Sequence, residues 1–455
     1  MSYMGKVRPT VALTSSDIVD GAVTATKIGD DAVTTAKIVD VAVTDSKVAN
    51  AINTSIAANT AKVTNATHTG DVTGATALTI AAGAVETAMV ADDAVTPAKM
   101  ADSAFLANRN MIINGAMQIH QRGTTVAGGT SNLYSPLDRW GLGSGSSFNF
   151  DVTATTNTTT VNTEDGFASA LMITPDSTQT PTGSHNATIF YRLEGFDCQR
   201  LQQGGADAHS FTLSFYAKAV NKTGVYSVQC IKKDAAGNGR YQVKEYTLTT
   251  SWVRQEITFE PDTNSLIRNS KAEAMAFYFS LACGVDDIVA PTTAWAANGG
   301  IKAGTNQVNF MASTSNEFHI TGVQLEIGRV ATPYEHKTYG QELAACQRYY
   351  SKSYNADVAP ATSGAVGACS SLAIYSTGSQ SLGARWVTSM RSAPTVVIYP
   401  PGSTNTGYVQ QTSNNAEVAA TAGDIGMDGF QYLSGSLPNT AANGVRFHWS
   451  ADAEL

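Results

Sequence analysis

Large apolar residues recur at every fifth position in two blocks of the N-terminal region. The first block contains Leu13, Ile18, Val23, Ile28, Val33, Ile38, Val43 and Val48, and the second contains Ile80, Val85, Val90, Val95, Met100 and Phe105. From Val23 to Val48 the flanks alternate between Ala-Val-Thr and Lys followed by Ile or Val, so the complete unit is ten residues long. A spacing of five fits neither the helical period of 3.6 nor the strand period of two. A single straight helix or strand would therefore scatter these side chains around its surface.

Each ten-residue unit contains too little apolar surface for one chain to build a core. Several copies in register can turn these residues towards a common axis and stack their units into a shaft. The pattern therefore predicts an extended repeat shaft over residues 13–107 of a parallel homotrimer, although the sequence alone leaves the number of chains open. Low-complexity disorder is the alternative, and the strict spacing in two separate blocks argues against it.

Short segments of alternating apolar and polar residues dominate residues 108–337. The clearest predicted strands cover residues 211–217, 225–230, 252–259 and 276–279. A period of two is typical of strands with one buried face, and Gly- and Asn-containing turns separate these strands. Many short strands joined by polar turns predict a jelly-roll β-sandwich as the middle domain.

The C-terminal part begins with the best helical pattern of the chain. Leu343, Cys346 and Tyr350 have helical spacing, which predicts an amphipathic connector within residues 338–356. Residues 357–455 contain little charge and several β-type runs, and they predict a small β-sandwich tip. The fold class is therefore mainly β, with a repeat shaft, a jelly roll and a terminal sandwich.

Composition excludes several classes of function. The chain of 455 residues has a formal net charge of -8 and no cluster of Lys or Arg, which argues against nucleic-acid binding. No run of about 18 apolar residues is present, so we expect no membrane insertion. The five cysteines form no CxxC pair and the seven histidines form no HxH or HExxH motif, so we expect neither a metal site nor a cofactor.

The sequence also predicts no enzyme. Hydrolysis of a glycosidic bond needs two carboxyl groups facing each other across a cleft, and no acidic pair is marked as such. No G-x-S-x-G nucleophile motif and no P-loop are present. We therefore assign no catalytic residues.

Aromatic residues are the candidates for binding a sugar, because an aromatic face can stack on a pyranose ring. Trp140, Trp252 and Trp295 are candidates in the middle domain, and core packing is the alternative reading of each. Trp295 lies in the loop-like segment TTAWAANGG and is expected to be the least core-like. Tyr408 and Tyr432 are the receptor-binding candidates in the terminal domain, because loops on a rigid scaffold often carry binding residues.

Two N-terminal segments carry a family resemblance. VALTSSDI at residues 11–18 and DAVTTAKI at residues 31–38 resemble the N-terminal region of tail fibre proteins from tailed bacteriophages. This resemblance implies that residues 1–12 attach the chain to other tail or baseplate proteins of a virion. It also implies that the C-terminal end faces the host cell.

Further segments resemble other parts of phage tail proteins. NGAMQI at residues 114–119 and DRW at residues 138–140 open a region that FHITGVQLEIG at residues 318–328 and ATPYE at residues 331–335 close. These segments resemble the carbohydrate-binding-module-like jelly roll of phage tail proteins. GVRFHWSADAEL at residues 444–455 resembles the terminal strand of phage fibre tips.

The resemblance and the patterns together predict a receptor-binding tail fibre. The expected partners are two further copies of the chain, other tail or baseplate proteins, and a host polysaccharide or lipopolysaccharide. Such a protein is made in the host cytoplasm, becomes part of the virion and needs no export signal. Two alternatives stay open, namely a structural adaptor of the virion without receptor binding and a depolymerase tailspike.

Overall fold

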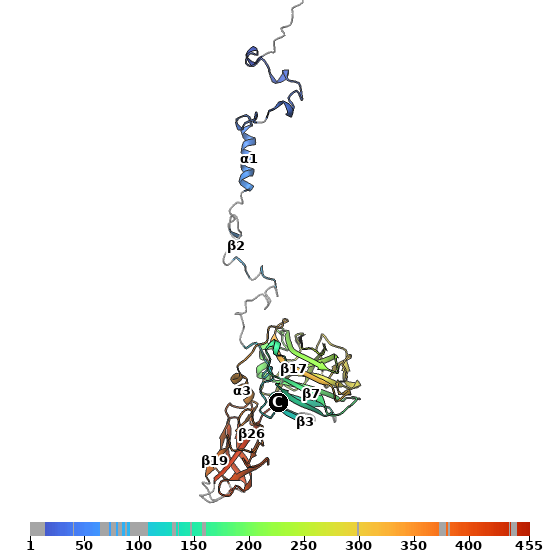
Figure 1. Cartoon of the computed structure of the whole chain (residues 1–455), viewed down its shortest axis with the longest axis vertical. Coiled ribbons are helices and arrows are strands. Elements are labelled where there is room, and N and C mark those ends of the chain that lie inside the picture. Colours follow the sequence, from blue (N-terminus) through green and yellow to red (C-terminus); the bar gives the residue numbers. More distant parts are fainter. Residues whose placement is uncertain are drawn as a thin grey trace, which may run out of the picture. The chain divides into compact units, whose positions relative to one another are not determined.

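The computed structural model divides the chain into two compact units, Met1–Val95 and Thr96–Leu455 (Figure 1). It describes residues 14–39, 41–63, 72–73, 79–80, 84–86, 89–91, 108–129, 133–134, 136–145, 148–156, 161–297, 300–372, 379–380, 383–435, 437 and 444–455. No helix within these ranges is both long and apolar enough to cross a bilayer.

The first unit repeats a pair of turns every ten residues. Four short 3-10 helices follow one another as η1 (Ser15–Asp17), η2 (Ala25–Lys27), η3 (Thr35–Lys37) and η4 (Asp45–Lys47). A second turn lies between successive helices, closed by hydrogen bonds such as the one from Ala22 N to Val19 O at 2.9 Å. Each apolar ladder residue from Ile18 to Val48 directly follows one of these turns. The five-residue spacing is therefore the length of one turn plus one ladder residue.

A lysine contact fixes the same geometry in three successive units. Lys27, Lys37 and Lys47 each donate from Nζ to a backbone carbonyl five residues earlier, at 2.6, 2.6 and 2.7 Å. The acceptors are the alanines of the Ala-Val-Thr motif, so the constant spacing of Ala and Lys in successive repeats has a structural cause. Three units with the same bonds adopt one repeating conformation.

An α-helix, α1 (Asn50–Val63), follows the first ladder block, and the extended repeat predicted over residues 13–107 did not include it. Ala49 O accepts hydrogen bonds from Ile52 N at 2.8 Å and Asn53 N at 3.2 Å, so the helix begins two residues after Val48, the last ladder residue of the first block. Beyond α1, the strands β1 (Val72–Thr73) and β2 (Thr79–Ile80) form an antiparallel pair.

The second unit begins with two antiparallel sheets. The first contains β4 (Leu133–Tyr134), β5 (Trp140–Ser144), β8 (Asn186–Glu194), β10 (Gly224–Lys233), β11 (Gly239–Leu248), β13 (Glu273–Cys283) and β15 (Ala296–Ala297). The second contains β3 (Thr125–Gly129), β6 (Phe150–Thr155), β7 (Ala170–Pro175), β9 (Phe211–Val220), β12 (Val253–Phe259) and β17 (Glu317–Ile327). Their strand orders are β15-β11-β10-β13-β8-β5-β4 and β12-β9-β17-β7-β6-β3.

One apolar core lies between these sheets. In β9 the alternating residues Phe211, Leu213 and Phe215 are fully buried, and they belong to the same core cluster as Phe277 and Phe279 of β13. The period of two puts these residues on the inner face of their strands. The predicted β-sandwich is therefore confirmed, and each of the four predicted strands lies within or next to an observed one.

Short elements connect the strands of the sandwich. They are η7 (Thr163–Asp165), α2 (Gly195–Cys198), η8 (Gln199–Leu201), η9 (Val285–Asp287) and η10 (Phe310–Ala312). The pair β14 (Ile288–Val289) and β16 (Ala303–Gly304) is parallel.

The connector forms helix α3 (Tyr339–Gln347), which Thr338 and Gln341 cap reciprocally. Its buried face differs from the predicted one. Glu342 and Cys346 are buried, whereas Leu343 is half-buried and Tyr350 already belongs to strand β18. Glu342 is buried because its carboxylate accepts a hydrogen bond from Asn114 N at 2.6 Å, a partner more than 200 residues away.

Within the described residues of the terminal domain, nine strands surround its core. They are β18 (Tyr350–Lys352), β19 (Cys369–Leu372), β20 (Ser379–Gln380), β21 (Ala384–Arg385), β22 (Thr395–Tyr399), β23 (Tyr408–Gln411), β24 (Glu417–Gly426), β25 (Gly429–Gly435) and β26 (Gly444–Asp452). β26 pairs with β18, β19, β22 and β23. The core includes Trp386, Phe430 and Trp449, with ring centroids 4.6 Å apart for Trp386–Trp449 and 5.8 Å apart for Trp386–Phe430.

A buried cluster of charges joins the jelly roll to the terminal domain. Arg139 of the jelly roll forms an ion pair with Glu454, and its guanidinium lies 3.5 Å from the ring centroid of Tyr349. Arg122 lies 3.4 Å from Glu454 and 3.8 Å from the centroid of the Tyr350 ring. Because these arginines are desolvated and paired with carboxylates of the other domain, the two domains form one unit.

Removing one partner of this cluster should destabilise the whole second unit. In Glu454→Gln the buried Arg139 loses its carboxylate, and we expect a loss of about 3–5 kcal/mol in the free energy of unfolding. The control is Glu256→Gln, which breaks a pair with Arg254 whose acidic side chain is 50% exposed, and should cost less than about 1 kcal/mol. Urea denaturation measures both, and equal losses would contradict the structural role of the cluster.

Asp138 should make stability depend on pH. Burial raises the pKa of this carboxyl from 3.8 to about 6, with Arg122 opposing the shift. The folded state therefore holds the proton more tightly than the unfolded state. This stabilising contribution is complete below about pH 4 and is lost as the pH rises through about 6. We expect Asp138→Asn to reduce the fall in the free energy of unfolding between pH 4 and 6 by roughly 1–3 kcal/mol. Asp286→Asn, at an exposed position, should leave this fall unchanged.

Candidate functional site

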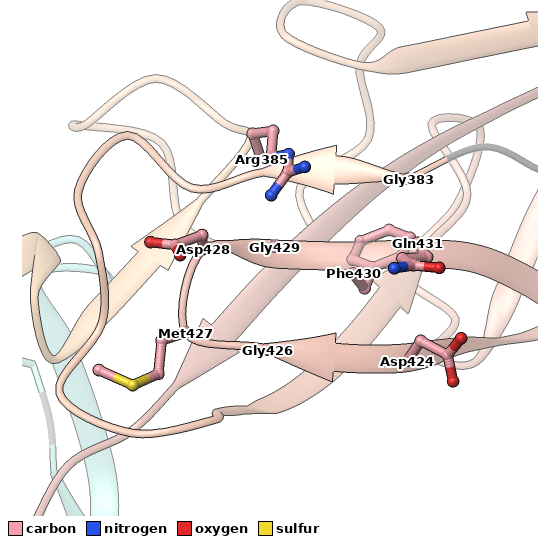
Figure 2. Close-up of a pocket in the computed structure, with 9 residues that line it drawn as sticks. All are labelled: Gly383, Arg385, Asp424, Gly426, Met427, Asp428, Gly429, Phe430 and Gln431. Atoms are coloured by element: carbon pink, nitrogen blue, oxygen red, sulfur yellow. The ribbon is translucent and has the colours of Figure 1, made fainter.

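A pocket opens on the terminal domain, over the sheet formed by β21, β24 and β25. Its volume is about 530 Å³. It is lined by Gly383, Arg385, Asp424, Gly426, Met427, Asp428, Gly429, Phe430 and Gln431. Figure 2 shows Met427 and Asp428 at the hairpin end, Arg385 on the neighbouring strand, and Gln431 and Asp424 further along the strands.

Glycines create the floor of this pocket. Arg385 of β21 and Gly426 of β24 both pair with Gly429 of β25. Of these three residues, which lie side by side across the sheet, only Arg385 has a side chain. At Gly429, with φ +155°, an added Cβ would lie 2.1 Å from the carbonyl oxygen of Ala384. At Gly383 it would lie 2.2 Å from the carbonyl oxygen of Phe430. Both positions require glycine because the backbones approach closely.

The rim of the pocket is held against the core. The turn Met427–Asp428 joins β24 to β25, and Trp386 donates from its backbone N to Asp428 O at 3.1 Å. The Trp386 indole donates to Gly426 O at 3.1 Å, and the Ser389 hydroxyl donates to the Asp428 carboxylate. Since Trp386 is buried against Trp449, the rim rests on the aromatic core of the domain.

The exposed polar groups of the pocket are mixed in character. Arg385 offers only donors, Asp424 and Asp428 offer acceptors, and the amide of Gln431 offers both. All four side chains are exposed, so they meet solvent and any bound molecule directly. Met427, 42% exposed, adds an apolar surface beside them. This arrangement can bind a molecule with several hydroxyl groups and one apolar face.

The predicted aromatic residues lie elsewhere. The expectation that Trp295 is the least core-like of the three tryptophans is wrong, because its side chain is 8% exposed in the jelly-roll core and its indole donates to Glu260 O at 2.6 Å. Trp140 is likewise a core residue. Trp252 is half-buried, with Lys218 Nζ 5.1 Å from its ring centroid. None of the three contributes to the pocket.

The two tyrosine candidates differ in position. Tyr408 is 39% exposed at the start of β23, and it pairs with Ala419 rather than with a pocket residue. Tyr432 follows Gln431 directly, and its ring covers Gly423, where an added Cβ would lie 2.3 Å from Cζ. Tyr432 therefore adjoins the pocket lining, whereas its half-buried ring packs on the neighbouring strand.

The ladder residues are exposed in the single chain. Ile18, Val23, Ile28, Val33, Ile38 and Val43 are between 43% and 57% exposed, and Ile80 and Val85 are 60% and 54% exposed. Val48 and Val90 are half-buried. The ladder positions Leu13, Val95, Met100 and Phe105 lie outside the described residues. These exposures do not test the homotrimer, which stays a prediction.

The pocket residues themselves were missed by sequence reasoning. The segment GDIGMDG at residues 423–429 has glycines at every third position around two aspartates, and it was the available signal. Arg385 lies some 40 residues earlier, and only strand pairing brings it to Gly429. Among the described residues, no three His, Cys, Asp or Glu side chains gather as a metal site would need.

Comparisons with known proteins give fold similarities only. No protein-family model matches the sequence, and no curated protein is significantly similar to it. Among solved structures, a CBM4 structure is 15% identical, covering 47% of this chain and 97% of that one at a TM-score of 0.25. A family 11 carbohydrate-binding module of a Clostridium thermocellum cellulase is 14% identical, covering 48% and 99% at a TM-score of 0.23.

A solved structure of a phage protein has a TM-score of the same size. The enzymatically active domain of bacteriophage CBA120 tailspike protein 4 is 10% identical, covering 48% of this chain and 21% of that one at a TM-score of 0.25. Similarities of this size leave the function of the chain open.

Two glycines of the pocket should respond differently to a methyl group. Gly429→Ala meets the Ala384 carbonyl and a positive φ, and should cost roughly 2 kcal/mol or more in unfolding free energy. At Gly426 the nearest atom to an added Cβ is Gly429 O at 3.8 Å, so Gly426→Ala should be neutral or stabilise by up to about 1 kcal/mol. Thermal or urea unfolding of both variants checks the pocket geometry.

Proposed function

We propose that this chain is a homotrimeric tail fibre of a bacteriophage that binds a host surface glycan through the pocket at residues 383–431. The observation that carries the binding proposal is the glycine-floored pocket, with its mixed donors and acceptors on the terminal domain. Assembly is supported by the exposed apolar ladder, which only partner chains can cover efficiently. Attachment of residues 1–12 to tail or baseplate proteins is supported by the resemblance of the N-terminal segments. The chain then belongs to the virion.

Sugar binding would use each type of group in the pocket. Hydroxyls at different points along a saccharide chain can donate to the carboxylates of Asp424 and Asp428 and accept from Arg385. The C–H face of a sugar ring can lie on Met427, which takes the place of the aromatic platform expected from the sequence. Host polysaccharide and lipopolysaccharide are the receptor classes that such chemistry suits.

Each pocket would bind weakly because it is open and small compared with a protein interface. Three pockets per fibre, and several fibres per virion, raise the effective affinity by increasing the local concentration of free sites. Weak individual contacts also let a fibre release and rebind, so that a virion can move over the host surface before it commits.

We propose binding without catalysis. A glycosidase normally holds one carboxyl group protonated in apolar surroundings and opposite a second carboxylate. Asp424 and Asp428 are both exposed to solvent, and the hairpin carries them on the outer surface of the domain. A structural adaptor of the virion without receptor binding is the other alternative, and it predicts no affinity for any glycan.

Filling the pocket should weaken attachment. Gly426→Leu places an apolar side chain over the floor without a backbone clash, and we expect binding to host cells or extracted polysaccharide to fall at least about tenfold, or ~1.4 kcal/mol. Arg385→Ala should act in the same direction. The matched control is Gly340→Leu on α3, where nothing lies within 4 Å of an added Cβ. Competition with phage adsorption by each purified protein measures the effect.

The outcomes separate the alternatives. If wild-type protein competes and the pocket variants compete equally well, the receptor site lies elsewhere on the chain. If wild-type protein neither binds glycan nor affects adsorption, the adaptor is favoured. Release of reducing ends from host polysaccharide would establish a depolymerase.

A further inference from the structure

Helix α1 interrupts the five-residue ladder with a different apolar pattern. Ile52 and Ile56 are 54% and 57% exposed, large values for isoleucine on a helix of a folded chain. The positions Ile52, Ile56, Asn59 and Val63 are separated by four, three and four residues. This is the spacing of the d and a positions of a coiled-coil heptad, which put one residue per turn against a partner helix. We call these four positions the α1 seam.

The seam determines what kind of partner can cover it. We infer that α1 packs in parallel and in register against α1 of two further copies of this chain, as a three-stranded coiled coil with Asn59 in its centre. Isoleucine at both a and d positions disfavours two-stranded coiled coils and shifts assembly to three or four strands. The trimeric shaft of the proposed function selects three, and the inference rests on that function in this respect.

The residues beside the seam fit identical partners. Ser55 and Thr60 flank it at g and e positions, and their hydroxyls donate to their own helix, to Ala51 O at 2.9 Å and Ile56 O at 2.9 Å. They can therefore be covered without leaving an unpaired donor. Oppositely charged e and g residues would specify a different partner, but Lys62 is the sole charged residue of the helix.

Asn59 reinforces the register that Ile52 and Ile56 already define. A polar residue in an otherwise apolar seam is tolerated where it meets the same residue of neighbouring chains, and any shift would place its amide against isoleucine. The helix directly continues the ladder, since Val48 O accepts from Asn53 Nδ2 at 3.4 Å. Fixing α1 in register therefore also fixes the ladder repeats of the three chains in register.

The helix also needs such partners to be stable. It has fourteen residues, and Asn, Thr, Ser and Ile make up eight of them. Isolated helices of this length are marginal in water even with better helix-forming residues. Burial of the seam by two neighbours supplies the stabilisation that the sequence of the helix lacks.

Disulfide cross-linking of the full chain tests this arrangement. In Asn59→Cys the thiols of parallel, in-register helices face one another, and mild oxidation should join two of the three chains into a covalent dimer on a non-reducing gel. The control is Ala57→Cys, at an outward b position of the same helix. Because a disulfide needs Cα atoms within roughly 7 Å, we expect Asn59→Cys to cross-link at least about tenfold faster than Ala57→Cys. The wild-type chain, with its own five cysteines, sets the background.

A second pair of variants separates the seam from helix formation. In the Asn59→Cys background, Ile52→Ser with Ile56→Ser should slow cross-linking at least about tenfold, although serine and isoleucine have similar helix propensity. Ala57→Ser with Ala58→Ser lowers helix propensity more and should leave the rate unchanged. Equal rates at positions 57 and 59 in a protein whose mass is that of a trimer would overturn the α1 inference and leave the fibre intact. A wild-type protein with the mass of a monomer would overturn the trimer itself.

Discussion

The ion pair between Arg139 and Glu454 is the contact on which the architecture of the second unit depends. Its partners come from the start of the jelly roll and the end of the terminal domain, and both are almost completely buried. Arg122, Asp138 and the rings of Tyr349 and Tyr350 extend the same cluster. A buried charge cannot be left without its partner, so separation of the domains is strongly opposed. The pocket is thus part of one body rather than of a hinged tip.

The first unit is governed by a shortage of apolar surface. Its turns satisfy backbone groups locally, and the lysine–carbonyl contacts repeat from unit to unit. The ladder residues from Ile18 to Val43 and the seam residues Ile52 and Ile56 are exposed in the single chain. In the proposed homotrimer, further copies of the chain would supply the missing half of each contact. The proposed assembly would thereby stabilise this unit.

The lining of the pocket differs from an aromatic sugar platform. Its floor is backbone, since Gly383 and Gly429 have no room for a side chain. The selecting groups are the charged and amide side chains at its edges, and apolar contact comes from Met427. In the proposed glycan binding, hydrogen-bond geometry rather than ring stacking would determine which hydroxyl pattern fits. The anchoring of the hairpin by Trp386 keeps these groups in place before any ligand arrives.

Local patterns in the sequence determined the local structure of this protein. The period of two predicted the strands around Phe211 and Phe277, and the period of five predicted a repeating unit, because both depend only on residues near one another in the chain. The helix α1 was missed although its apolar residues have heptad spacing. Its Asn- and Thr-rich composition concealed the pattern within a low-complexity region.

Contacts between distant residues were decided only by the tertiary structure. Trp295 sits in a polar loop sequence and is nevertheless buried, because Phe211 and the Glu260 carbonyl lie where the loop returns to the sheet. Arg385 meets Gly429, and Arg139 meets Glu454, through pairings that no local pattern encodes. Whether a residue is buried, and which partner a charged residue finds, depend on how the whole chain packs. The sequence determined which segments form strands, turns and repeats, and the fold determined which of their polar residues became a core and which became a site.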